Sequence, residues 1–194
     1  RVEGWIACRA ASESLIPLRS PQDALRPTAV ALGSFDGLHQ GHRRVIAAIA
    51  AAPTPGLVPT VVSFWPHPRE VLHGETRLRL DLTAEKLELL EPLGIRQLVL
   101  VPFTRELAAL APEAFVERVL AGQLQAWRIA VGDNFRFGAG RRGDAQDLVR
   151  IGALHGIDVR VLPMLWDGSE RVSSSRIRRA LAAGEIGEAR RLLE

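Results

Sequence analysis

Apolar runs and amphipathic stretches alternate through most of this chain. Residues 28–33, with the sequence TAVALG, form a continuous apolar run ending in glycine, which is typical of a buried parallel strand. Later runs predict further strands, at residues 57–64, 96–102, 127–132 and 157–162. Helical spacing of apolar positions predicts helices at residues 40–52, 83–93, 112–121, 144–155, 174–183 and 186–193.

Capping and turn residues support several of these boundaries. Thr83 is expected to cap one helix and Gly94 to end it. Pro112 lies in the first turn of the next helix, where its missing N–H costs nothing. Asp167 and Gly168 predict a turn at the tip of a hairpin.

The order of the elements predicts the fold class. Strands that alternate with helices indicate an α/β domain, with a parallel sheet carrying helices on both faces. With 194 residues, of which 47% are hydrophobic and 24% charged, the whole chain fits one globular domain. Ligands of such sheets bind beyond the carboxyl ends of the strands, so the irregular segment 134–143 is a candidate binding region.

Several classes of protein are disfavoured by simple features. No apolar run approaches the ~18 residues of a membrane span, and Arg9, Glu13 and Arg19 interrupt the first apolar stretch, which argues against a signal peptide. Cys8 is the single cysteine, so no internal disulfide can form. A cytoplasmic location is therefore predicted. The first residue is Arg1 rather than Met, which is consistent with a missing natural N-terminus.

The basic side chains are almost all arginines. Lys86 is the one lysine among 25 Lys and Arg residues, the net charge is +3, and the sequence pI is about 10.2. A high pI is one sign of nucleic-acid binding, but these arginines are scattered and mostly offset by Asp and Glu. A small polyphosphate ligand accounts better for the densest groups, which are Arg141–Arg142 and Arg176, Arg178 and Arg179.

The strongest chemical signal directly follows the first strand and opens a helix. In residues 33–42, GSFDGLHQGH, Gly33 and Gly37 permit a tight turn, and N–H groups at the helix start attract anions. His39 and His42 are three residues apart, so both would face one spot and hydrogen-bond phosphate oxygens, which favours their protonated forms. The alternatives are ordinary surface or core histidines, or a zinc site whose third ligand is not evident.

A second motif, SSSRIR at residues 173–178, is typical of a helix start. Its serines suit an N-cap and a first turn, where hydroxyl and N–H groups can hold phosphate oxygens. Arg178 lies about one turn further on and could bind a polyphosphate through a bidentate contact. The alternative is an ordinary capped surface helix.

A third motif, FWPHP at residues 64–68, follows the second predicted strand. Its two prolines are expected to clamp His67 in a stiff loop, and the aromatic rings beside it could cover a flat ligand. The alternative is a rigid turn that packs on the core.

A fourth segment, residues 131–144, is rich in glycine and arginine. Asn134 offers both a donor and an acceptor for the edge of a heterocycle, and one of Phe135 and Phe137 is expected to face the core. Asp144 is a candidate cap for the helix that follows. Phosphate and solvent both remain open as partners of Arg136, Arg141 and Arg142.

Together these segments resemble the bacterial bifunctional FAD synthetases, which join riboflavin kinase to FMN adenylyltransferase, and specifically their N-terminal adenylyltransferase module. The match runs from about Thr28 to Glu194 and includes residues 86–103, KLELLEPLGIRQLVLVPF. The first motif alone specifies only the wider HxGH nucleotidyltransferase superfamily, and the other three together point to its flavin member. The resemblance implies a Rossmann-like fold with ATP and FMN as substrates. It also implies Mg²⁺ held through the substrate phosphates, with no protein ligand assigned.

The resemblance implies a role for each matching residue. His39, His42 and Arg178 would be catalytic, with the histidines stabilising the transition state. The expected FMN-binding residues are Pro66, His67, Pro68, Asn134, Phe135 and Arg136. The expected ATP-binding residues are Gly33, Phe35, Asp36, Gly37, His39, Gly41, His42, Ser173, Ser174, Ser175 and Arg178.

Three positions depart from the family pattern. Ser175 stands where the family commonly has Thr, which keeps the hydroxyl, and Asn134 stands where members carry Asp or Asn. Trp65 is bulky for its position. In the family a riboflavin kinase module follows about where this chain stops, so the chain is expected not to phosphorylate riboflavin and is interpreted as a domain of a longer protein.

The predicted reaction is adenylyl transfer from ATP to FMN. The FMN phosphate would attack the ATP α-phosphorus in line, giving FAD and pyrophosphate. One alternative is transfer to another acceptor, such as pantetheine phosphate or nicotinamide mononucleotide. A second is a non-catalytic module that binds flavin or nucleotide. Neither a nucleic acid nor a membrane is an expected partner.

Overall fold

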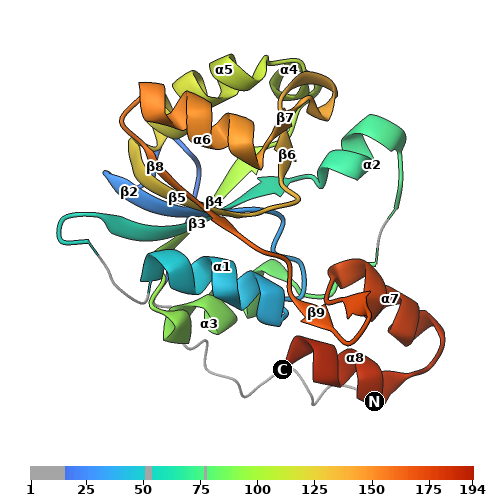
Figure 1. The fold of residues 1–194 in the computed structure, drawn as a ribbon. Coiled ribbons are helices and arrows are strands. Elements are labelled where there is room, and N and C mark those ends of the chain that lie inside the picture. Colours follow the sequence, from blue (N-terminus) through green and yellow to red (C-terminus); the bar gives the residue numbers. More distant parts are fainter. Residues whose placement is uncertain (1–15, 51–53, 77) are drawn as a thin grey trace, which may run out of the picture.

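A six-stranded parallel sheet forms the centre of the computed structural model, which describes residues 16–50, 54–76 and 78–194. Figure 1 shows the twisted sheet between layers of helices. The strands lie in the order β1-β4-β3-β2-β5-β8. Their bounds are β1 Leu18–Arg19, β2 Thr28–Leu32, β3 Val58–Trp65, β4 Gln97–Pro102, β5 Ala126–Gly132 and β8 Asp158–Leu162.

The first strand, β1, lies at one edge of the sheet beside β4, and the chain then passes to the centre of the sheet at β2. After β2, the chain adds β3 and β4 on one side, then crosses to add β5 and β8 on the other. This is the Rossmann-like order, and it reverses between β2 and β5. Ligands of such sheets bind at that reversal, beyond the carboxyl ends of the strands. The predicted α/β parallel sheet is thereby confirmed, and the fold points to one edge for a site.

Helices cover both faces of the sheet. Figure 1 shows α1 (Gln40–Ala50) and α3 (Thr83–Leu90) on one face, and α5 (Pro112–Phe115) and α6 (Ala145–Leu154) on the other. All five residues of β2 are buried, because alternate side chains pack against opposite layers. Ala29 and Ala31 belong to the apolar cluster under α1, whereas Val30 and Leu32 belong to the cluster under α6. Because helices cover both faces of the sheet, every side chain of β2 is buried, and this explains its unbroken apolar sequence.

A small closing unit follows the sheet. The strands β9 (Trp166–Asp167) and β10 (Glu170–Arg171) form an antiparallel hairpin, and α7 (Ser174–Ala182) packs on α8 (Ile186–Leu193). This unit has its own apolar cluster, whose buried members are Val172, Ile177, Ala180, Ala189 and Leu192. The remaining short elements are α2 Pro68–His73, η1 Glu91–Leu93, α4 Arg105–Ala108, η2 Val116–Gln123, β6 Arg136–Phe137, η3 Ala139–Arg141 and β7 Gly143–Asp144.

Most predicted elements are confirmed, and the differences have local causes. Thr83 was expected to cap α3, but it is the first residue of the helix: the Leu82 amide donates to the Glu85 carboxylate, which caps that end. The helix predicted at 112–121 continues as a wider, π-type segment to Gln123. The predicted hairpin at Asp167 is confirmed. Residues 51 and 52 of the helix predicted at 40–52 lie outside the described residues, as does Cys8.

Within the part of the chain that the structure describes, every helix is too short or too polar to cross a membrane.

Candidate active site

One cavity of about 480 Å³ opens where the strands end. It is lined by Leu32 at the end of β2 and Gly33 directly after it, by Gly132 at the end of β5 and by Leu162 at the end of β8. Three of the motifs meet there because parallel strands place their carboxyl ends at one edge, and the second motif reaches the cavity from the start of α7. The predicted site residues that line it are Gly33, Phe35, Asp36, His39, Gly41, His42, His67, Pro68, Asn134, Phe135, Arg136, Ser173, Ser174, Ser175 and Arg178. Gly37 and Pro66 were also predicted but are not among its lining residues.

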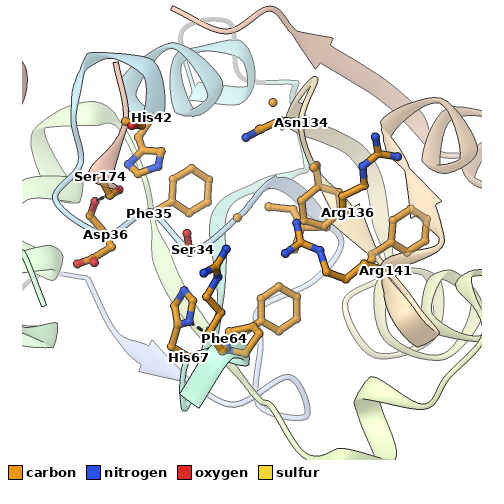
Figure 2. A pocket seen from close by; sticks show the side chains of 18 of the residues that line it. Ser34, Phe35, Asp36, His42, Phe64, His67, Asn134, Arg136, Arg141 and Ser174 are labelled. Carbon is orange, nitrogen blue, oxygen red and sulfur yellow. Dashed lines mark hydrogen bonds between the residues drawn. The ribbon is translucent and has the colours of Figure 1, made fainter. Parts of the chain in front are cut away.

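The two histidines of the first motif lie side by side. His39 immediately precedes α1 and His42 is in its first turn. Their rings stack with centroids 3.6 Å apart at 18°, which confirms the predicted proximity. A Cβ on Gly41 would lie 3.2 Å from the His39 ring, so glycine makes room for this packing. Figure 2 shows His42 beside Phe35 at one end of the cavity.

Both imidazoles are neutral near pH 7. Burial lowers the pKa of His39 to about 4. Burial also lowers the pKa of His42 well below its usual value, with smaller effects from the charges of His39 and Lys86. The His42 amide donates to the His39 carbonyl at 2.8 Å and, more weakly, to His39 Nδ1 at 3.3 Å. His42 Nδ1 is buried and has no hydrogen-bond partner among residues 16–50, 54–76 and 78–194. Both rings line the cavity, where a neutral imidazole can donate or accept one hydrogen bond at each nitrogen that a ligand reaches.

The backbone around the histidines is strained. Phe35 has φ 47° and Leu38 has φ 42°, although neither is glycine, and both side chains are buried in the core. Such conformations cost roughly 1–3 kcal/mol each and persist only where the surroundings enforce them. The Ser63 hydroxyl contributes by donating to the Ser34 carbonyl at 3.0 Å. The loop is therefore held in a defined shape beside the cavity.

The second motif supplies a helix start at the same end of the cavity. Ser173 is the N-cap of α7 and accepts from the Arg176 amide at 3.2 Å, which confirms the predicted cap. The Ser174 hydroxyl donates to the Asp36 carbonyl at 2.8 Å, a contact drawn in Figure 2. This hydrogen bond joins the two motifs across the fold. The positive end of the α7 dipole thus lies beside the histidine loop.

Arg178 is engaged by the protein itself. Its guanidinium pairs with the Asp36 carboxylate, and its Nε donates to the Leu78 carbonyl at 2.7 Å. The other Asp36 oxygen accepts from the Leu80 amide at 2.9 Å. Arg178 lines the cavity, and its predicted contact with pyrophosphate stays a prediction. Since both Asp36 oxygens have protein partners, Asp36 is an anchor in this structure.

Gly37 supports the loop from behind. It has φ 84°, and a Cβ there would lie 2.9 Å from the Leu80 side chain. Its amide donates to the Asp81 carboxylate at 2.8 Å. This explains why Gly37 does not line the cavity although the motif requires it.

The opposite end of the cavity is aromatic. The Phe64 ring meets the Phe103 ring edge-on at 5.9 Å and lies 6.2 Å from the Phe115 ring. The Phe135 and Phe137 rings stack at 5.7 Å and 17°. Phe137 is the buried member of this pair, as expected for one of the two, and Phe135 is only partly buried. This wall offers flat apolar surface to a ligand.

Polar groups border the aromatic end. Asn134, Arg136 and Arg141 lie across the cavity from His42 and Asp36 (Figure 2). Arg136 pairs with Asp144 at 3.3 Å, and both side chains are exposed to solvent. Asp144 also caps α6, accepting from two backbone amides, as its position predicted. These side chains can therefore move toward a ligand at small cost.

The third motif forms a short connection between β3 and α2, with His67 between its two prolines as expected. Pro68 begins α2 because a proline fits the first helical position, and His67 caps that helix by accepting from the Arg69 amide at 3.2 Å. The capping role of His67 was not predicted. The bulky Trp65 is partly exposed, with the Arg79 guanidinium 3.5 Å from its ring centroid.

The sequence reasoning missed several lining residues. They come from elements whose patterns are short or weak, chiefly α2, α4 and the segment before β9. Most are apolar and carry no distinctive spacing, so nothing separates them from ordinary core positions. Arg69 and Arg171 are the charged exceptions, and Arg171 lies two residues before the start of the second motif. The missed residues include Arg69, Leu72, Phe103, Leu107, Met164 and Arg171.

With this geometry in place, comparison with known proteins gives a clear family. The family model described as FAD synthetase matches residues 21–176. This chain belongs to the FAD synthetase family. The matched residues include the histidine loop and the start of the second motif, and thus both elements of the polar end of the cavity.

Curated relatives agree with this assignment. The bifunctional riboflavin kinase/FMN adenylyltransferase of Escherichia coli K12 is 34% identical over 90% of this chain and 56% of its own length. The FAD synthetase of Listeria monocytogenes is 31% identical over 90% of this chain and 71% of its own length. The chain thus spans about half the length of the bifunctional relatives and more of the second protein.

A solved structure has the same arrangement of elements. It is described as a macrolide-efflux protein from Streptococcus pneumoniae, and it matches with a TM-score of 0.79 at 29% identity. The match covers 92% of this chain and 60% of that one. The closing helices are therefore included with the sheet in a known architecture.

Proposed function

We propose that this chain transfers the adenylyl group of ATP to FMN, forming FAD and pyrophosphate. The observation that carries the proposal is a cavity with two unlike ends. One end places two stacked, neutral histidines beside the start of α7, and the other is a wall of phenylalanine rings. A polyphosphate suits the first end and a flavin ring suits the second. Family membership supports the same pair of substrates.

The reaction is an in-line displacement at the ATP α-phosphorus. An oxygen of the FMN phosphate forms the new P–O bond while the bond to the β-phosphate oxygen breaks, and pyrophosphate leaves with the electron pair. The attacking phosphate is already ionised near pH 7, so a protein base is not needed. Catalysis then consists of positioning and of stabilising charge on the phosphate oxygens.

His39 and His42 would donate to the oxygens around the α-phosphorus. Both rings line the cavity, and each neutral imidazole carries one N–H that can donate. Both rings are neutral before the ligand arrives. Phosphate charge would raise both pKa values toward neutrality, so the pair gains positive charge where negative charge develops.

The start of α7 would hold the leaving pyrophosphate. Ser174 and Ser175 present N–H groups at the positive end of the helix dipole. Arg178 lies one turn further on and would exchange part of its contact with Asp36 for the phosphates. Since Asp36 is engaged by protein groups, Mg²⁺ would take its oxygens from the substrate phosphates and water.

FMN would lie along the aromatic end, with its phosphate directed to the histidines. Phe135 supplies a partly buried face, and the amide of Asn134 suits the edge of the flavin ring. Arg136 lines the same cavity as an exposed cation, and its charge would attract the FMN phosphate into the cavity. We further propose that a riboflavin kinase activity supplies the FMN, as the name of the Escherichia coli relative indicates for that protein.

Chromatography of flavins tests the proposal directly. The purified chain, mixed with FMN, ATP and Mg²⁺, should yield FAD with an equal amount of pyrophosphate, and His42→Ala should yield almost none. Pantetheine phosphate and nicotinamide mononucleotide, offered as acceptors with the same ATP, should give no product. FMN that binds without pyrophosphate release would contradict catalysis and leave a binding module.

A further inference from the structure

A strip of irregular backbone, residues 78–81, lies behind both phosphate-binding motifs. The Leu80 amide donates to Asp36, and the Leu78 carbonyl accepts from Arg178. The Leu80 side chain packs against the apolar cluster of α7 and α8 and touches the position of Gly37. The strip therefore contacts the histidine loop and the α7 unit together, although neither the four motifs nor the family resemblance assigns it a role.

Asp81 fixes this strip to the histidine loop. One carboxylate oxygen accepts from the Gly37 amide at 2.8 Å, and the other pairs with Lys86 Nζ at 3.1 Å. The side chain of Asp81 is 6% exposed and that of Lys86 is 12% exposed, so this ion pair is far more buried than a surface pair. A buried carboxylate needs its cation, because an unpaired charge there is strongly disfavoured.

Lys86 is singular in the sequence as well. It is the one lysine among 25 Lys and Arg residues, in a chain that uses arginine elsewhere. An ammonium is a compact charge on a flexible stem, whereas a guanidinium is a wide planar fork. The charge of Lys86 also reaches the active site, because it contributes to the lowered pKa of His42.

We propose that Asp81 and Lys86 are positioning residues for adenylyl transfer: their buried ion pair holds the Asp36–Gly37 turn, which keeps the histidine pair in place relative to Arg178 and α7. Neither residue lines the main cavity. The inference rests on the function proposed above, and it assigns the segment from 78 to 86 a part in that reaction.

Steady-state kinetics of paired variants test the role. Asp81→Asn keeps an acceptor for the Gly37 amide but weakens the ion pair, and Lys86→Met removes the charge while keeping the stem. Both should lower kcat by roughly tenfold to a hundredfold, since small misplacements of reacting groups have such effects. The KM for FMN should stay within about twofold, because the aromatic end does not depend on the strip. Lys86→Arg, which restores the charge, should recover most of the loss.

Two controls separate positioning from lost stability. Leu148→Ala removes a fully buried side chain under α6, remote from the histidine loop, and should lower Tm while leaving kcat unchanged below the unfolding range. In a double-mutant cycle, Asp81→Asn should cost less than about twofold when His42 is already alanine. Equal losses in both backgrounds, unchanged kcat in Asp81→Asn and Lys86→Met, or an equal kcat loss in Leu148→Ala would overturn the proposal.

FAD formation by the wild-type chain tests the proposed function separately from the positioning role of Asp81 and Lys86. If it forms no FAD, the proposed function fails, and the rise in Tm that ATP alone produces becomes the measure of positioning. Asp81→Asn should then reduce that rise while leaving the rise produced by FMN unchanged. Equal ATP-induced rises in wild type and Asp81→Asn would reject the positioning role.

Discussion

At the histidine end of the cavity, three chain segments are tied together by hydrogen bonds to backbone groups, whereas the aromatic end rests mainly on side-chain packing. The carboxylate of Asp36, for example, joins the histidine loop both to Leu80 and to Arg178. Across the cavity, Phe135 is partly buried and Arg136 makes an exposed ion pair. The first end holds its donors before any ligand arrives, and the second can adapt to what binds.

This difference separates two tasks. Displacement at phosphorus needs groups fixed within a fraction of an ångström, which a strained and tied loop provides. Recognition of a flat ring needs apolar area, which several phenylalanines can share. Substitutions at the histidine end should therefore change kcat, and those at the aromatic end should change KM for FMN.

The largest effect is expected at His42. His42→Ala removes the donor proposed for the reacting phosphate and should lower kcat by roughly a hundredfold or more, because loss of one such donor has effects of this size in other enzymes. FMN affinity, measured by quenching of flavin fluorescence, should not change. A tenfold weaker FMN affinity with kcat retained would erase the distinction between the two ends.

The histidine end should also make the fold sensitive to acid. Because the pKa of His39 is about 4 in the folded chain and 6.5 is its ordinary value, the unfolded chain binds a proton first as pH falls. Stability is unaffected above pH 6.5 and falls between pH 6.5 and 4, by roughly 2 kcal/mol at pH 5. Urea unfolding at pH 7 and 5 should show a smaller loss for His39→Gln than for wild type. Identical losses would contradict a buried neutral imidazole.

A smaller change, in KM for FMN rather than in kcat, is expected at the aromatic end. Phe135→Ala removes a ring from the wall and should raise KM for FMN by roughly tenfold, since an aromatic contact contributes about 1 kcal/mol beyond its buried area. The kcat at saturating FMN should stay near wild type. A fall in kcat with unchanged KM would place Phe135 with the reacting groups. Phe135→Leu is the matched control that keeps apolar bulk without the ring.

The smallest effect is expected at Arg136. Its ion pair with Asp144 is largely exposed, so Arg136→Gln should leave Tm nearly unchanged. The same change should raise KM for FMN a few-fold at low salt, and the difference from wild type should shrink as salt screens the phosphate. Steady-state kinetics of wild type and Arg136→Gln at about 0.05 and about 0.5 M salt measure this dependence of KM on salt. A salt-independent difference would show that Arg136 acts through packing.

The sequence predicted the histidine end far better than the aromatic end. A glycine-flanked histidine pair after a buried strand is a local pattern, and its outcome, two stacked rings, depends on adjacent residues. The engagement of Arg178 by Asp36 joins positions 142 residues apart, so no local pattern contains it. Leu107 lines the cavity from α4, which was not predicted, because apolar residues in a short helix resemble any core position, and Phe103 lies in the connection just before that helix.

The elements of the fold also differ in how well the sequence predicted them. Five strands were predicted because burial on both faces leaves an unbroken apolar signal, as in β2. The two-residue edge strand β1 was missed, since it pairs with β4 through only Leu18 and Arg19. The helix α3 begins at Thr83, where it was predicted to begin, but its cap was misassigned, because Glu85 rather than Thr83 provides it.

The hydrogen bond from Ser174 to Asp36 has a consequence for biosynthesis. The histidine loop leaves the ribosome early, yet its hydroxyl partner is 138 residues later in the chain. A nascent chain that has emerged only as far as β8 has its sheet strands but neither the second motif nor the closing helices. Under the proposed function, adenylyl transfer would begin only after the α7 unit docks, and products of premature termination before Ser173 would be inert.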